Sequence, residues 1–203
     1  RIAMIADPES VLAFWFGSPG PAVEVAGRQR TLWFGKSQAN DRVVVERFAA
    51  TLAAANAGEL DHWAHTPRGR LALVIVLDQF PHHIFRDRPQ AFATDPQALA
   101  QCLAALAADD DRHLTPIERV FLYLPLEHAE SLAMQERAVS LYAQLAHGVA
   151  ADEQALFNGF LDYARRHCDV VARFGRFPHR NEILGRASTP DEREFLKQPG
   201  SRF

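Results

Sequence analysis

The chain has 203 residues, a formal net charge of −3 and a hydrophobic content of 48%. That length suits one large domain, which on folding would bury about 70% of the surface that its unfolded chain exposes. The acidic balance argues against nucleic-acid or membrane binding through bulk positive charge, and no apolar run is long enough to span a bilayer. We therefore expect neither nucleic acid nor a membrane among its partners.

The cysteines and the N-terminal residues indicate a cytoplasmic protein. Cys102 and Cys168 lie far apart in helical patterns without metal-type spacing, as expected for buried, reduced thiols. Asp7 and Glu9 interrupt the first apolar stretch before it could form the core of a secretory leader.

Helix starts are marked by dipeptides that place a capping side chain before a proline. The capping oxygen accepts a free backbone N–H, and proline lacks a donor that would go unused at the first helical position. The dipeptides are Asp7-Pro8, Thr66-Pro67, Asp95-Pro96, Thr115-Pro116 and Thr189-Pro190. Glycines that follow periodic apolar stretches indicate helix ends. These are Gly17, Gly58, Gly148 and Gly175.

Between these signals, the apolar periodicity predicts about eight helices. Their ranges are 8–16, 41–57, 67–80, 96–108, 116–123, 131–147, 152–174 and 190–197, with a short turn near 181–185. Glycine and proline crowd residues 17–30, which we expect to form a surface loop, and residues 198–203 should form a tail. No linker divides the chain, so we expect a single all-helical domain over residues 1–203.

The segment from Leu71 to Leu77, LALVIVL, is apolar throughout. Its periodicity alone fits a buried strand as well as a helix. The Thr66-Pro67 start favours a helix, and no other segment offers a partner strand. Such a helix would be apolar on all sides and therefore central. The sequence thus predicts an all-α fold.

Asp78 lies near the end of this central helix. At helical spacing its side chain projects between Val74 and Ile75, toward the packed interior. A carboxylate there needs a partner, because burying an unpaired charge is costly. Gln79 beside it adds two donors and an acceptor.

A second polar cluster lies in the segment PLEHAE, residues 125–130. We expect Pro125 to end one helix there, which would place Glu127 and His128 at a corner between two helices. Gln135 lies on the apolar margin of the helix that follows.

The richest supply of cations is RFGRFPHRN, residues 173–181, where a glycine and a proline break the helical pattern. Between residues 165 and 186, six arginines accompany two acids. We expect this bend to bring Arg176 or Arg180 to Asp78, because Asp78 has no basic residue one helical turn away.

These residues all lie where loops leave or enter core helices, and such ends can converge on one cavity. Arginine and asparagine there would hold a carboxylate or phosphate, while histidine and carboxyl groups would orient it or transfer protons. The candidate ligand-binding residues are Arg176, Arg180, Asn181, Asp78, Gln79 and Gln135. The candidate catalytic residues are His179, Asp78, Glu127 and His128. The partner that this predicts is a small anionic molecule.

The motifs VLAFWFG, TPRGRLALVIVLDQFPHHIFR, FATDPQAL, ERVFLYLPLEHAE and RFGRFPHRNEILGR resemble the bacterial family known as domain of unknown function nine-two-four. The resemblance runs from about residue 7 to the C-terminus. It implies an all-helical, tetratricopeptide-like (TPR-like) α-α superhelix and supplies no established activity. Where the family pattern usually reads Phe-Pro-Arg-Asn, this chain has Phe80-Pro81-His82-His83.

Two interpretations without catalysis remain open. In the first, Arg176 and Arg180 only neutralise Asp78 and Glu127 and fasten the last helices to the bundle. In the second, a TPR-like groove binds an extended peptide and the arginines hold its terminal carboxylate.

A hydrolase-type enzyme is a further alternative, although the chain has no nucleophile motif, phosphate-cradling glycine loop or dinucleotide fingerprint. We expect no cofactor. His82, His83, Glu127, His128 and His179 lack the i, i+4 spacing of a helical zinc site, so we also expect no metal. Trp15 and Trp33 are interpreted as core residues.

Overall fold

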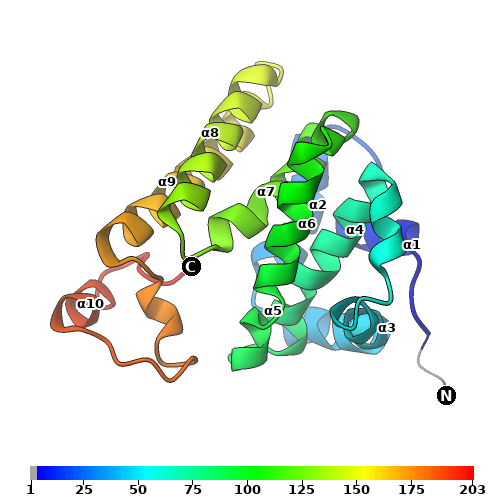
Figure 1. Cartoon of the computed structure of the whole chain (residues 1–203). Helices are drawn as coiled ribbons and strands as arrows, with labels where there is room; N and C mark the ends of the chain where they lie inside the picture. Colours follow the sequence, from blue (N-terminus) through cyan, green and yellow to red (C-terminus); the bar gives the residue numbers. More distant parts are fainter. Residues whose placement is uncertain (1–3) are drawn as a thin grey trace.

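The computed structural model describes residues 4–203, most of which are helical, and it contains no strand among them (Figure 1). The α-helices are α1 (Pro8–Phe16), α2 (Ala22–Phe34), α3 (Gln38–Asn56), α4 (Pro67–Asp78), α5 (Phe80–Ile84), α6 (Asp95–Ala107), α7 (Pro116–His128), α8 (Leu132–Gly148), α9 (Gln154–Phe174) and α10 (Pro190–Phe195). Short 3-10 turns are η1 (Asp61–His65), η2 (Pro89–Phe92), η3 (Asp110–His113) and η4 (Pro178–Arg180). The predicted all-α fold is confirmed.

Most of the predicted helix starts are confirmed by their caps. The side chains of Asp7, Thr66 and Thr189 each accept a hydrogen bond from a backbone N–H in the first turn. Asp95 differs: α6 begins at Asp95 itself, and its carboxylate pairs with Arg180 instead of capping. A polar residue before proline therefore located the helix start, but not the role of its side chain.

Two predictions about helix boundaries are wrong. Residues 17–30 are not a loop, because α2 covers most of them and buries Ala22, Val25, Leu32 and Trp33. Packing of that buried stripe outweighs the low helix propensity of its internal glycine. Likewise, Pro125 does not end α7, which continues to His128. Its ring is buried among the surrounding helices, whose packing holds the chain helical beyond it.

The helix α4 is the centre of the fold, as its composition predicts. Every residue from Leu71 to Leu77 is buried, and the helix packs against α1, α3, α6 and α7. Burying each large apolar side chain contributes about 1.5–3 kcal/mol, so this helix is a major part of the core. Cys102 is buried as expected, whereas Cys168 is partly exposed.

The pair α8 and α9 forms a helical hairpin beside this core, reached through α7 (Figure 1). Gly175 ends α9 with a left-handed φ of 71°, and its N–H donates to the carbonyl of Val171. The chain then turns through η4, where Arg180 contacts Asp95 at the start of α6 and the carbonyl of His128 at the end of α7. Among residues 4–203, no helix is long and apolar enough to cross a membrane.

Two glycines test the packing of the helices. A Cβ at Gly69, in the first turn of α4, would overlap the carbonyl oxygen of Trp63, whereas a Cβ at Gly159 of α9 meets nothing within 4 Å. We predict that Gly69→Ala lowers the free energy of unfolding by about 2 kcal/mol or more. Gly159→Ala should raise it by about 0.5–1 kcal/mol. Urea unfolding measures both, and a neutral Gly69→Ala would contradict the close approach of η1 to α4.

Candidate functional site

Asp78 is fully buried at the last position of α4, and two polar side chains contact its carboxylate. Its Oδ1 lies 2.8 Å from Nδ1 of His128, at the end of α7. Its Oδ2 accepts a 2.6 Å hydrogen bond from Nε2 of Gln79. The predicted inward direction is therefore confirmed, but the predicted arginine partner is wrong. The partner comes from α7 because that helix packs directly against α4.

Asp78 and His128 each favour the charged form of the other. Burial would raise the pKa of the Asp78 carboxyl, but the positive charge and hydrogen bond of His128 outweigh it and hold that pKa below its usual value. Burial would likewise lower the pKa of His128, and the negative charge of Asp78 instead raises it. The contact is therefore a mutually stabilising carboxylate–imidazole pair.

Arg180 links the 173–181 bend to the 125–130 segment and to Asp95 at the start of α6. From η4, it lies 3.3 Å from Oδ2 of Asp95 and donates a 3.0 Å hydrogen bond to the carbonyl of His128. Its guanidinium lies 4.6 Å from the ring centroid of Phe92 and 4.8 Å from that of Phe177. Such contacts orient the planar guanidinium and add cation–π attraction.

The ion pair of Arg180 with Asp95 is long and sensitive to pH. Burial, together with the nearby negative charge of Asp78, raises the pKa of the Asp95 carboxyl to about 6. Asp95 therefore begins to lose its charge not far below neutral pH. The 3.3 Å separation is also long for a charge-assisted hydrogen bond.

A cavity of about 390 Å³ lies beside these groups, within the range of roughly 300–1,000 Å³ that is typical of small-molecule sites. Its walls come from the end of α2, from α5, α7 and α9, from η4 and from the C-terminal tail. Five histidines line it: His82, His83, His128, His167 and His179.

Several buried polar atoms of the cavity-lining residues have no hydrogen-bond partner within residues 4–203. They are Nε2 of His82, Oε1 of Glu127, Nδ1 of His179 and Nε of Arg180. Buried polar atoms nearly always have a partner, since leaving one unpaired costs about 1–3 kcal/mol. Their concentration at one cavity marks it as a polar site.

Burial keeps most of these groups neutral at pH 7. It lowers the pKa of His82 and of His167 to about 3 and that of His179 to about 4. It raises the pKa of Glu127 to about 8, so this carboxyl is mostly protonated. Glu127 and His167 are thus both mostly neutral, so the 3.4 Å contact between Glu127 and Nδ1 of His167 is not an ion pair. The same nitrogen lies 2.9 Å from the carbonyl of Tyr163.

Five of the candidate residues line the cavity. They are Gln79, Glu127, His128, His179 and Arg180. Asp78 lies directly behind two of them. Gln135 does not line the cavity, because its amide donates to the carbonyls of Leu126, Glu127 and Ala129 and so closes the end of α7.

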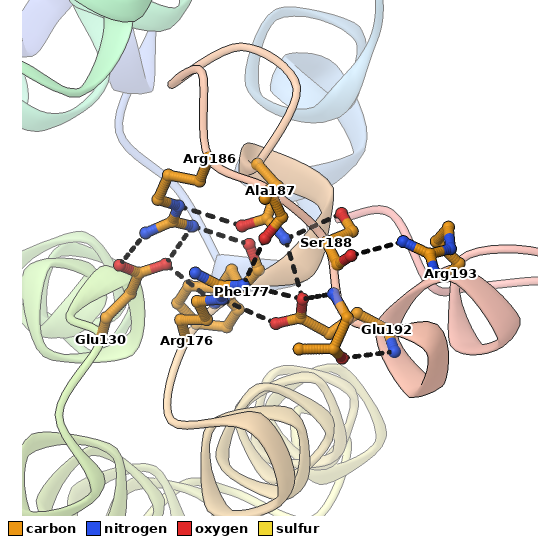
Figure 2. A network of polar contacts seen from close by, with 10 residues as sticks. Glu130, Arg176, Phe177, Arg186, Ala187, Ser188, Glu192 and Arg193 are labelled. Carbon is orange, nitrogen blue, oxygen red and sulfur yellow. Dashed lines mark hydrogen bonds and ion pairs between the residues drawn. The ribbon is translucent and has the colours of Figure 1, made fainter.

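Arg176 and Asn181 belong to a separate network that folds the C-terminal segment (Figure 2). Arg176 forms a bidentate pair with Glu192, and the amide of Asn181 donates to the same carboxylate. In the same network, Arg186 pairs with Glu130 at 2.7 Å. These contacts match the interpretation in which Arg176 only fastens the last helices to the bundle.

The cavity also contains aromatic residues that sequence reasoning did not select. Trp33, Phe34, Tyr142, Phe160, Tyr163 and Phe203 line it. No local signal in the sequence distinguishes them from ordinary core aromatics. Within residues 4–203, no three histidine, cysteine or acidic side chains lie close enough together to hold a metal ion.

Comparison with known proteins supports the resemblance seen in the motifs. Residues 11–200 match the family described as "Bacterial protein of unknown function (DUF924)". A solved structure of a protein of unknown function from Agrobacterium tumefaciens is 38% identical, with a TM-score of 0.78. The alignment covers 94% of this chain and 96% of that one. No curated protein matches the sequence.

The buried pair generates a testable prediction. Asp78→Asn removes the negative charge that raises the pKa of His128, so that pKa should fall below its ordinary value of about 6.5. Breaking the buried pair by removing one partner should also lower the free energy of unfolding by roughly 3–5 kcal/mol. Ring-proton NMR titration and urea unfolding measure the two effects.

Asp41→Asn is the control in a more exposed pair. Asp41 lies at the same 2.8 Å distance from His83 and also forms a bidentate pair with Arg86, but its side chain is 17% exposed and water reaches it. Its loss should be clearly smaller. Equal losses in the two variants, or an unchanged pKa of His128, would contradict the buried ion pair.

Proposed function

We propose that this protein, which belongs to the bacterial DUF924 family of unknown function, binds a small anionic ligand in the cavity beside His128. The observation that carries the proposal is Arg180. Its guanidinium is buried and fixed between two rings, yet its Nε–H has no partner among the described residues. A carboxylate or phosphate oxygen would supply the missing acceptor.

The charges around the cavity support an anion. Lys36 and Arg202 are exposed lining residues, and Arg180 lies deeper. Of the lining acids, Asp87 is exposed to water and Glu127 is mostly protonated at neutral pH. Positive charge in a poorly solvated site attracts an anion more strongly than the same charge on an open surface.

The size of the cavity favours a small molecule over an extended peptide. About 390 Å³ suits a compact ligand. The alternative in which the arginines are purely structural accounts well for Arg176, whose N–H groups are engaged by Glu192 and by the carbonyl of Ala187. It does not account for the unpaired Nε of Arg180.

An acid–base enzyme is a second candidate, favoured by the Asp78–His128 pair. Because Nδ1 of His128 is held by Asp78, its other ring nitrogen remains for a molecule in the cavity. A carboxylate that orients an imidazole beside a bound substrate is the arrangement used in general acid–base catalysis. In hydrolysis of a bound ester, water would supply the new hydroxyl and the His128 imidazolium would donate its proton to the leaving oxygen. The proton released by the water would then restore the imidazolium.

Thermal unfolding tests the binding proposal. Phosphate, sulfate or small carboxylates should raise the melting temperature in a saturable way, because a ligand at a hundredfold excess over its Kd stabilises by about 2.7 kcal/mol. Arg180→Gln should abolish the effect and Arg202→Gln should weaken it. Arg176→Gln, in the separate C-terminal network, should keep the full response. Identical responses in all four proteins would place the anion elsewhere.

Turnover tests the second candidate. If His128 is a general acid, the protein should hydrolyse phenyl phosphate or phenyl acetate, whose leaving groups need a proton. His128→Gln should then lower kcat by about 10²–10⁴-fold while anions still raise the melting temperature. A bound ester that is never hydrolysed by the unsubstituted protein would leave binding alone as its function.

A further inference from the structure

An exposed aromatic side chain marks one end of the cavity. Phe34, the last residue of α2, is 58% exposed, although large apolar side chains are usually covered. Its ring centroid lies 6.4 Å from that of Phe160 on α9, and both residues line the cavity. An exposed ring that lies against a second, partly buried ring in a cavity lining is a surface to which an apolar group can bind.

The aromatic walls offer rings and few free hydrogen-bonding groups. The hydroxyl of Tyr142 donates to the carbonyl of Val120 at 2.8 Å. The indole N–H of Trp33 donates to the carbonyl of Trp15, also at 2.8 Å. Because these polar atoms are already engaged, the two side chains present mainly apolar surface to the cavity. Such walls suit an aromatic body better than a sugar, whose hydroxyls would need partners.

A series of ring contacts within the cavity lining leads from Tyr163 to His179, next to Arg180. Tyr163 on α9 lies 4.6 Å from His167, measured between ring centroids. Phe203 of the C-terminal tail lies 3.8 Å from His167 and 5.6 Å from His179. His179 immediately precedes Arg180 in η4. The cavity therefore combines a buried guanidinium with a lining of aromatic side chains.

We propose that the ligand of this cavity is an aromatic anion, with its carboxylate or phosphate at Arg180 and its ring in the aromatic part of the cavity that includes Phe34 and Phe160. This inference rests on the proposed anion binding and adds the chemistry of the rest of the ligand. The neutral histidines around the cavity, His82 and His179 among them, keep unpaired nitrogens that can hydrogen-bond the anionic group.

Isothermal titration with matched anions tests the proposal. Phenyl phosphate is compared with methyl phosphate and inorganic phosphate, and 3-phenylpropanoate is compared with propanoate. The ring should tighten binding by about tenfold or more in each series, because it transfers apolar surface from water to the cavity. The two series also show whether the site prefers a phosphate or a carboxylate.

Phe34→Ala and Val23→Ala provide the matched variants, because both residues are exposed on α2 and only Phe34 lines the cavity. Phe34→Ala should weaken binding of the aromatic anions by several-fold and leave inorganic phosphate unchanged, and Val23→Ala should change neither. Equal affinities for phenyl and methyl phosphate, or unchanged binding in Phe34→Ala, would overturn the aromatic ligand while leaving anion binding intact. If none of the anions binds, both proposals fail.

Discussion

The contact between Asp78 and His128 is the constraint on which the rest of the site depends. A carboxylate at the end of an entirely apolar helix must be paired, and the 2.8 Å contact with His128 fixes the end of α7 against α4. That contact also sets the direction of the His128 ring and raises its pKa. Gln79 satisfies the second carboxylate oxygen, so the pair is complete within the protein. Both residues that contact this carboxylate, Gln79 and His128, line the cavity.

The two arginines of the bend illustrate how structural and functional charge differ. Arg176 forms a bidentate contact with Glu192, and the carboxylate of Glu192 also accepts a hydrogen bond from Asn181. Arg180 has a longer contact with Asp95, whose own charge is weakened by burial, and it keeps one N–H unpaired among the described residues. A charge that only held the fold together would be expected to complete its hydrogen bonds. The incomplete one is therefore the better candidate for contact with a ligand.

Local sequence signals predicted most of the helices, but they did not predict contacts between residues that lie far apart in the sequence. Capping residues followed by proline located the starts of α1, α4 and α10. The apolar run of α4 predicted the central place of this helix and the burial of Asp78. The partner of Asp78 depends on which helix packs beside α4, and this is a tertiary property. Residues 17–30 show the same limit, because the buried face of α2 outweighs its glycine. Phe34 carries no local signal that separates it from a core aromatic, and its exposed place at the cavity depends on how the surrounding helices pack.

The most direct test of the central claim is a crystal structure of the protein with phenyl phosphate. The account predicts a phosphate oxygen within hydrogen-bond distance of Nε of Arg180, the phenyl ring among the cavity aromatics near Phe34 and Phe160, and His128 still bonded to Asp78. A phosphate bound only in the Arg176–Glu192 network, or an occupied cavity in which Arg180 does not touch the anion, would contradict it.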